Sequence, residues 1–126
     1  IEDLLPLRDA LGDTLNAAEP LDEASTVAAR RAHYEADMRF HLAIAELGGN
    51  PVLTTMLRSL LELLKPHLVQ IPWSVERKEL TVNAHLELFE ALRSGDAEKV
   101  GSRMTEHTGM ARDSLLKKLW DTPGVA

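Results

Sequence analysis

The sequence contains no cysteine, few aromatic residues and no long uninterrupted hydrophobic run. Without cysteine, neither a disulfide scaffold nor a thiolate zinc site can form, so any metal must be held by nitrogen and oxygen ligands. Charged residues interrupt the hydrophobic runs, and no basic segment followed by an apolar one opens the chain. We therefore expect neither a membrane span nor a signal peptide.

Positive charge is also scarce. The 126 residues include 20 acidic and 14 basic side chains, which gives a formal net charge of −6. Such a chain is not suited to gripping a phosphate backbone by itself, so any contact with DNA requires a separate domain. The sequence begins at Ile1, and its first residues are typical of the interior of a domain. We expect a fragment of a longer protein.

Hydrophobic residues recur every three or four positions, which is the pattern of amphipathic helices, and no alternation of period two indicates a strand. We expect five helices, over about residues 2–18, 23–47, 51–68, 75–93 and 97–120. Asp22, Asn50 and Asp96 are suited to cap the second, third and fifth helices, and glycines follow the second and the fourth. Short connections predict an all-α, antiparallel helical bundle over residues 1–120, followed by a frayed tail at 121–126.

The third helix has the widest apolar stripe. Its members are Leu53, Met56, Leu57, Leu60, Leu61, Leu64 and Leu68. This stripe predicts a central core helix, and Pro66 should kink it or end its regular part.

Asp37 and His41 are the most unusual pair in the sequence. They are four residues apart in the second helix and therefore share one face, which also carries Phe40 and Ile44. A carboxylate and an imidazole thus point toward the core, where both need polar partners.

His85 and His107 repeat this feature, each within the apolar stripe of its own helix. A divalent cation accepts neutral imidazole nitrogens and a carboxylate, so one ion would satisfy all four groups at once. We predict a metal site formed by Asp37, His41, His85 and His107. Zinc or nickel is expected, and iron and manganese are the alternatives.

Simpler interpretations remain for each polar residue. Asp37 can pair with Arg39 or a helix terminus, and each histidine can bond to a neighbour. His33 and His67 are expected at the surface or just behind the metal ligands, and Trp73 either covers a pocket or packs in its loop. The candidates for binding an anionic effector are Arg58, Lys65 and Arg103, although a solvated helix face is the default for each.

Five segments carry a resemblance to a known family. They are Asp37–His41, Ala45–Pro51, Ala84–Leu92, Ser94–Ala97 and Met104–His107. With them the chain resembles, from about residue 2 to 116, the FCD domain, which is the C-terminal ligand-sensing domain of FadR-type regulators in the bacterial GntR family. In the metal-binding members, the positions that match Asp37, His41, His85 and His107 hold a divalent metal.

The resemblance implies a cytoplasmic transcription regulator, not an enzyme, that forms a homodimer and binds a small organic acid beside the metal. DNA would be bound by an N-terminal winged helix-turn-helix domain, which we expect to be missing here together with the first helix of the FCD domain. Two rivals remain open. One is a metal-dependent enzyme, such as a non-haem iron oxygenase or a hydrolase, and the other is a structural bundle with hydrogen-bonded histidines.

Overall fold

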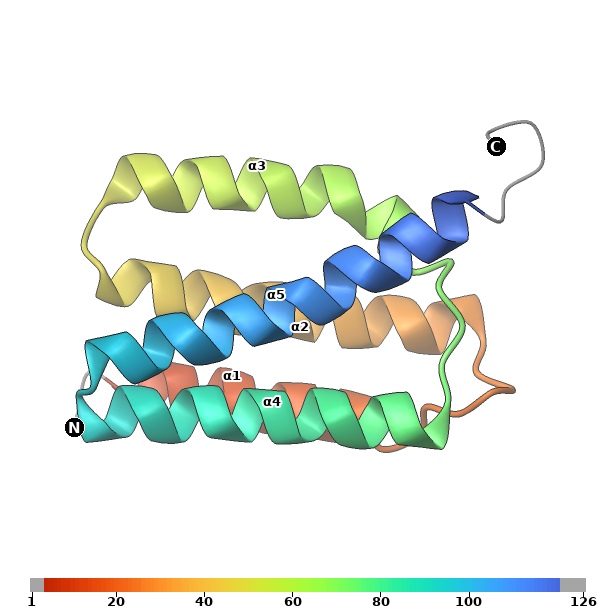
Figure 1. Cartoon of the computed structure of the whole chain (residues 1–126), viewed down its shortest axis with the longest axis horizontal. Coiled ribbons are helices and arrows are strands. Elements are labelled where there is room, and N and C mark those ends of the chain that lie inside the picture. Colours follow the sequence, from red (N-terminus) through yellow and green to blue (C-terminus); the bar gives the residue numbers. More distant parts are fainter. Residues whose placement is uncertain (1–3, 121–126) are drawn as a thin grey trace.

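The computed structural model describes residues 4–120 and consists of five antiparallel helices (Figure 1). They are α1 (Leu5–Ala18), α2 (Val27–Leu47), α3 (Pro51–Leu68), α4 (Val75–Ser94) and α5 (Ala97–Trp120). The predicted all-α bundle is confirmed, whereas the predicted tail at 121–126 lies outside the described residues. None of the described helices has the length and apolar character that crossing a membrane requires.

Local capping explains most of the helix boundaries. The side chain of Asn50 accepts hydrogen bonds from the backbone N–H groups of Val52 and Leu53, and the Asp96 carboxylate accepts one from Lys99, as predicted. Gly95, with a φ of 75°, ends α4 in the left-handed conformation that a glycine adopts without strain.

The predicted start of the second helix was wrong. Asp22 accepts a 2.8 Å hydrogen bond from the Ala24 N–H in the connecting turn, and α2 begins only at Val27. The Thr26 hydroxyl caps it by accepting a bond from the Ala29 N–H. An Asp side chain that bonds to the backbone two residues later stabilises a turn in place of a helix.

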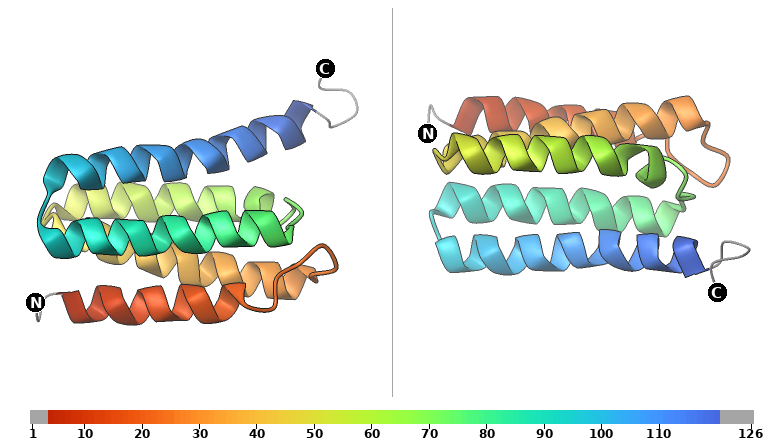
Figure 2. Two further views of the ribbon diagram at one scale, coloured as in Figure 1. Left: turned by 60° about the horizontal axis from the view of Figure 1, so that its bottom comes forward. Right: turned by 90° about the horizontal axis from the view of Figure 1, so that it is seen from above.

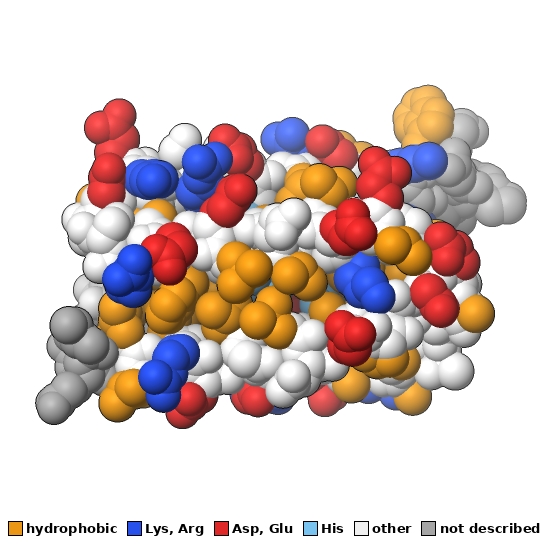
Figure 3. All heavy atoms as spheres, turned by 90° about the horizontal axis from the view of Figure 1, so that it is seen from below, with side chains coloured by type: hydrophobic (Ala, Val, Ile, Leu, Met, Phe, Trp, Pro, Cys, Tyr) orange, Lys and Arg blue, Asp and Glu red, His pale blue; other side chains and the backbone are white. Residues whose placement is uncertain are grey.

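The main helix contacts are those of α1 with α2, α2 with α3, α1 with α4 and α4 with α5. In Figure 1, α5 crosses in front of α2, between α3 and α4, and Figure 2 shows the helices from two further sides. The core lies where α1 meets α2 and α4. Its buried members are Leu7, Ala10, Leu11, Phe40 and Leu88. On the face seen from below, a band of apolar side chains lies between charged ones (Figure 3).

The prediction that the third helix is a central core helix was wrong. Only Thr54 of α3 is buried, while Met56 is 62% exposed and Leu63 is 71% exposed. α3 packs mainly on α2. Of its seven-residue apolar stripe, Leu53, Met56 and Leu60 are exposed, and the other four members are half-buried. Pro66 lies inside α3, which ends two residues later at Leu68.

α5 has little apolar packing of its own. No α5 residue whose burial is described is buried, and the inward stripe of Met104, His107 and Ala111 is half-buried. The helix packs mainly on α4. A polar contact between α5 and α2 therefore has a large influence on where α5 lies.

Gly95 and Gly12 have different backbone environments, so replacing each with alanine should change the stability of the protein in opposite directions. Gly95→Ala should destabilise the protein by about 1 kcal/mol, because its positive φ is strained for a residue with a Cβ. Gly12→Ala should stabilise it by about 0.5–1 kcal/mol, because an added Cβ inside α1 meets nothing within 4 Å. Urea unfolding of both variants measures this, and the same sign for both would contradict the described backbone.

Candidate metal centre

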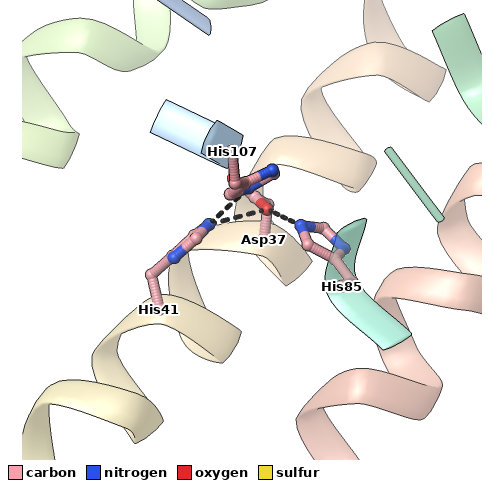
Figure 4. Close-up of side chains that lie close together, drawn as sticks. All are labelled: Asp37, His41, His85 and His107. Atoms are coloured by element: carbon pink, nitrogen blue, oxygen red, sulfur yellow. Dashed lines mark hydrogen bonds and ion pairs between the residues drawn. The ribbon is translucent and has the colours of Figure 1, made fainter. Parts of the chain in front are cut away.

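Four polar side chains from three helices meet beside the core (Figure 4). Asp37 and His41 lie one turn apart on α2, and they face His85 of α4 and His107 of α5. The Asp37 Oδ1 lies 2.8 Å from the His85 Nε2 and 3.2 Å from the His41 Nε2, and the His41 Nε2 lies 3.1 Å from the His107 Nε2. One ligand atom from each residue fits within a span of 4.8 Å.

These separations match those of atoms that share one metal ion. Ligand atoms about 2.1 Å from a common ion lie about 3.0 Å apart at neighbouring octahedral positions and about 3.4 Å apart in a tetrahedron. Although the Asp37 Oδ1 and the His85 Nε2 are only 2.8 Å apart, neither has a hydrogen-bond partner of good geometry among the described residues. Two polar atoms that lie close together without hydrogen-bond geometry are arranged as two ligands of the same ion would be.

The protonation states suit cation binding. Burial by itself would raise the pKa of the Asp37 carboxyl, but His41 and then His85 hold that pKa well below its usual range. Burial lowers the pKa of His107 to about 4, helped by His85 and His41, so this imidazole is neutral at pH 7. Burial would also lower the pKa of His41, but the Asp37 carboxylate raises it above its ordinary value. A cation at this centre would replace the proton that His41 takes up beside Asp37.

A cavity of about 340 Å³ opens beside these groups. Asp37 and His107 form one part of its wall, and His33, Trp73 and Arg77 form another. The rest of the lining combines the apolar Leu68, Leu80, Met110 and Ala111 with the polar Tyr34, Thr81, Asp113 and Ser114. The Asp113 carboxylate is largely exposed and is paired with Arg112 at 3.2 Å. A small molecule in this cavity would touch both the four-residue centre and a second polar wall.

His33 and His67 lie outside the group of four converging residues, as the sequence suggested. His67 is exposed on α3. His33 is buried, with its ring 6.4 Å from that of His85, and it is not one of the four converging residues. Arg39 is exposed, and among the described residues no ion pair joins it to Asp37.

The three cations proposed for effector binding lie elsewhere. Lys65 contacts Glu62 at 3.4 Å, and Arg103 contacts Glu106 at 3.4 Å. Arg58 lines a shallow depression at the start of α3 that includes none of the four converging residues. None of the three cations lines the 340 Å³ cavity.

Sequence reasoning missed Arg77, the cation that does line this cavity. A signal for it was present, because Arg77, Thr81 and His85 follow one another at four-residue intervals along α4 and all face the same region. Trp73 both lines the cavity and packs with Leu21 and Tyr34, so both of its predicted roles are realised.

Comparison with known proteins agrees with this architecture. Residues 5–109 match the FCD domain family. The chain belongs to the FCD domain family. It is also 38% identical over 86 residues to an uncharacterised HTH-type transcriptional regulator, YcbG, of Bacillus subtilis. That match covers 68% of this chain but 36% of the relative, and no solved structure matches the chain. The resemblance to a GntR-family regulatory domain is thereby confirmed.

The FCD domain should lose stability in mild acid. Burial lowers the pKa of His33 from 6.5 to about 4, against the opposing charge of Asp37. As the pH falls, the unfolded chain takes up this proton first, so the stabilisation is complete above pH 6.5 and declines toward pH 4. Unfolding of the metal-free protein should therefore need about 1–2 kcal/mol less at pH 5 than at pH 7.5.

Urea titrations in the presence of a chelator measure this difference. His33→Gln should reduce the loss between the two pH values, whereas His67→Gln, at an exposed position, should leave it unchanged. An equal pH dependence in wild type and His33→Gln would contradict the assignment of a neutral, buried His33.

Proposed function

We propose that this FCD domain is the ligand-sensing part of a transcription regulator, and that a divalent metal held by Asp37, His41, His85 and His107 carries its effector. The observation that supports this most strongly is the convergence of one carboxylate and three imidazoles from three helices beside a cavity. The YcbG relative is itself named a transcriptional regulator, which agrees with a regulatory role.

The charges of the four residues favour an anionic effector. Asp37 contributes one negative charge, and neutral imidazoles contribute none, so a site that holds a divalent ion keeps a net positive charge. When bound, the ion would supply one or two open coordination positions to a carboxylate. Zinc and nickel are our first candidates, and iron and manganese also accept this nitrogen and oxygen ligand set.

The way α5 packs gives a route from binding to regulation. α5 rests mainly on α4, and its contact with α2 runs through His107 and His41. A ligand that strengthens or weakens this contact shifts the equilibrium between alternative positions of α5 on the bundle. A differential of about 1–3 kcal/mol is enough for allosteric control. We propose that a winged helix-turn-helix domain elsewhere in a homodimeric protein responds to this change and carries the DNA contact.

Metal analysis after purification without chelator tests the proposal. Wild type should retain about one divalent ion per chain and should melt at a higher temperature with the metal than with a chelator, because the ion binds only the folded state. His107→Gln should lose both the metal and the metal-dependent rise in melting temperature.

His67→Gln is the matched control, because it removes an exposed histidine outside the centre. It should keep the stoichiometric metal and the full rise in melting temperature. Circular dichroism should show the same helix content for both variants. Wild-type protein that binds no zinc, nickel, iron or manganese would exclude the proposed centre.

A further inference from the structure

The cavity beside the metal centre has a second polar wall that the metal does not explain. Its members come from α2, from the connection before α4 and from the start of α4. His33 is 1% exposed and Trp73 is 3% exposed, and both line the cavity. The Trp73 Nε1 and both ring nitrogens of His33 are buried and have no hydrogen-bond partner among the described residues.

Such atoms are costly to bury without a partner, so a partner from outside the chain is the economical explanation. The Trp73 N–H can only donate a hydrogen bond, and a neutral His33 offers one donor and one acceptor. Both side chains lie at the same wall, with their ring centres 4.8 Å apart. A ligand group that accepts hydrogen bonds would satisfy Trp73 and one nitrogen of His33.

Arg77 gives this wall a positive charge. Its guanidinium donates to the Tyr34 hydroxyl and to the Pro72 carbonyl, both at 2.9 Å, and lies 4.5 Å from the centre of the Trp73 ring. These contacts hold the guanidinium in place while leaving other N–H groups without a partner in the described part of the chain. No carboxylate within residues 4–120 forms an ion pair with Arg77.

We propose that Arg77, Trp73 and His33 form a second anion-binding subsite, and that the effector is a dicarboxylate with one end at the metal and the other at this subsite. The inference rests on the proposed function, because it needs the metal to hold the first carboxylate. The apolar side chains that also line the cavity, such as Leu80 and Met110, suit the short carbon chain of such a ligand.

Charge decides between this ligand and a monocarboxylate with an apolar tail. A tail placed against Arg77 would remove water from a guanidinium without giving it an acceptor, which is unfavourable. A second carboxylate would instead accept charge-assisted hydrogen bonds from Arg77 and a further one from Trp73. The structure therefore assigns the second end of the ligand as anionic.

Isothermal titration of the metal-loaded protein tests this. The probes are succinate, glutarate and adipate, each matched to the monocarboxylate of equal chain length, namely butyrate, valerate and hexanoate. We expect at least one dicarboxylate to bind about tenfold or more tightly than its matched monocarboxylate, which corresponds to about 1.4 kcal/mol. Trp73→Phe, which keeps an aromatic ring at this position but removes the N–H, should reduce this preference several-fold.

Arg77→Gln should abolish the preference, whereas Arg93→Gln, at an exposed position later in α4, should preserve it. Arg77 also donates hydrogen bonds to Tyr34 and Pro72, so Arg77→Gln could fail to fold. In that case the Trp73→Phe result tests the subsite. Equal binding of dicarboxylates and monocarboxylates would overturn the subsite alone, as would a preference that neither variant changes. Metal-loaded protein that binds no carboxylate at all would overturn the proposed function, and this inference with it.

Discussion

The burial of the Asp37 carboxylate beside three imidazoles is the constraint on which the rest of this structure depends. A carboxylate removed from water is unfavourable unless positive charge or hydrogen-bond donors replace the water. Here His41 and His85 supply this compensation within 3.2 Å and 2.8 Å of the Asp37 Oδ1, and His107 completes the group from α5. Among the described α5 side chains none is buried, and Met104 packs only at the edge of the apolar core, so this polar group adds an important contact between α5 and the rest of the bundle.

The proposed sensing site involves a helix with little apolar packing, which has a physical consequence. Elements held by few apolar contacts lie at the low end of local stability, and small changes in binding free energy are enough to move them. The cavity lies between Asp37 on α2, Arg77 on α4 and Met110 on α5, so a ligand there contacts all three helices at once. Binding and the position of α5 are therefore coupled through the same few side chains.

The sequence was sufficient for those parts of the structure that depend on local spacing. The separation of Asp37 and His41 by four residues places both on one face, and the apolar stripes around His85 and His107 point them inward. The structure brings the four together, while their role as metal ligands stays a prediction. What failed depends on tertiary packing. The wide apolar stripe of α3 indicates that one face of this helix can be buried. It does not indicate whether a neighbouring helix covers that face. Likewise, the position of the Arg77 guanidinium depends on its hydrogen bond to Tyr34, which is 43 residues away in the chain.

Amide hydrogen exchange measured with the metal and with a chelator tests the central claim most directly. If the four-residue centre holds α5 on the bundle, metal should slow exchange along α5 around His107 by tenfold or more, while the already buried segments near Phe40 and Leu88 change little. Protection of α5 that is equal in the two conditions would show that apolar packing alone holds this helix, and it would contradict the account.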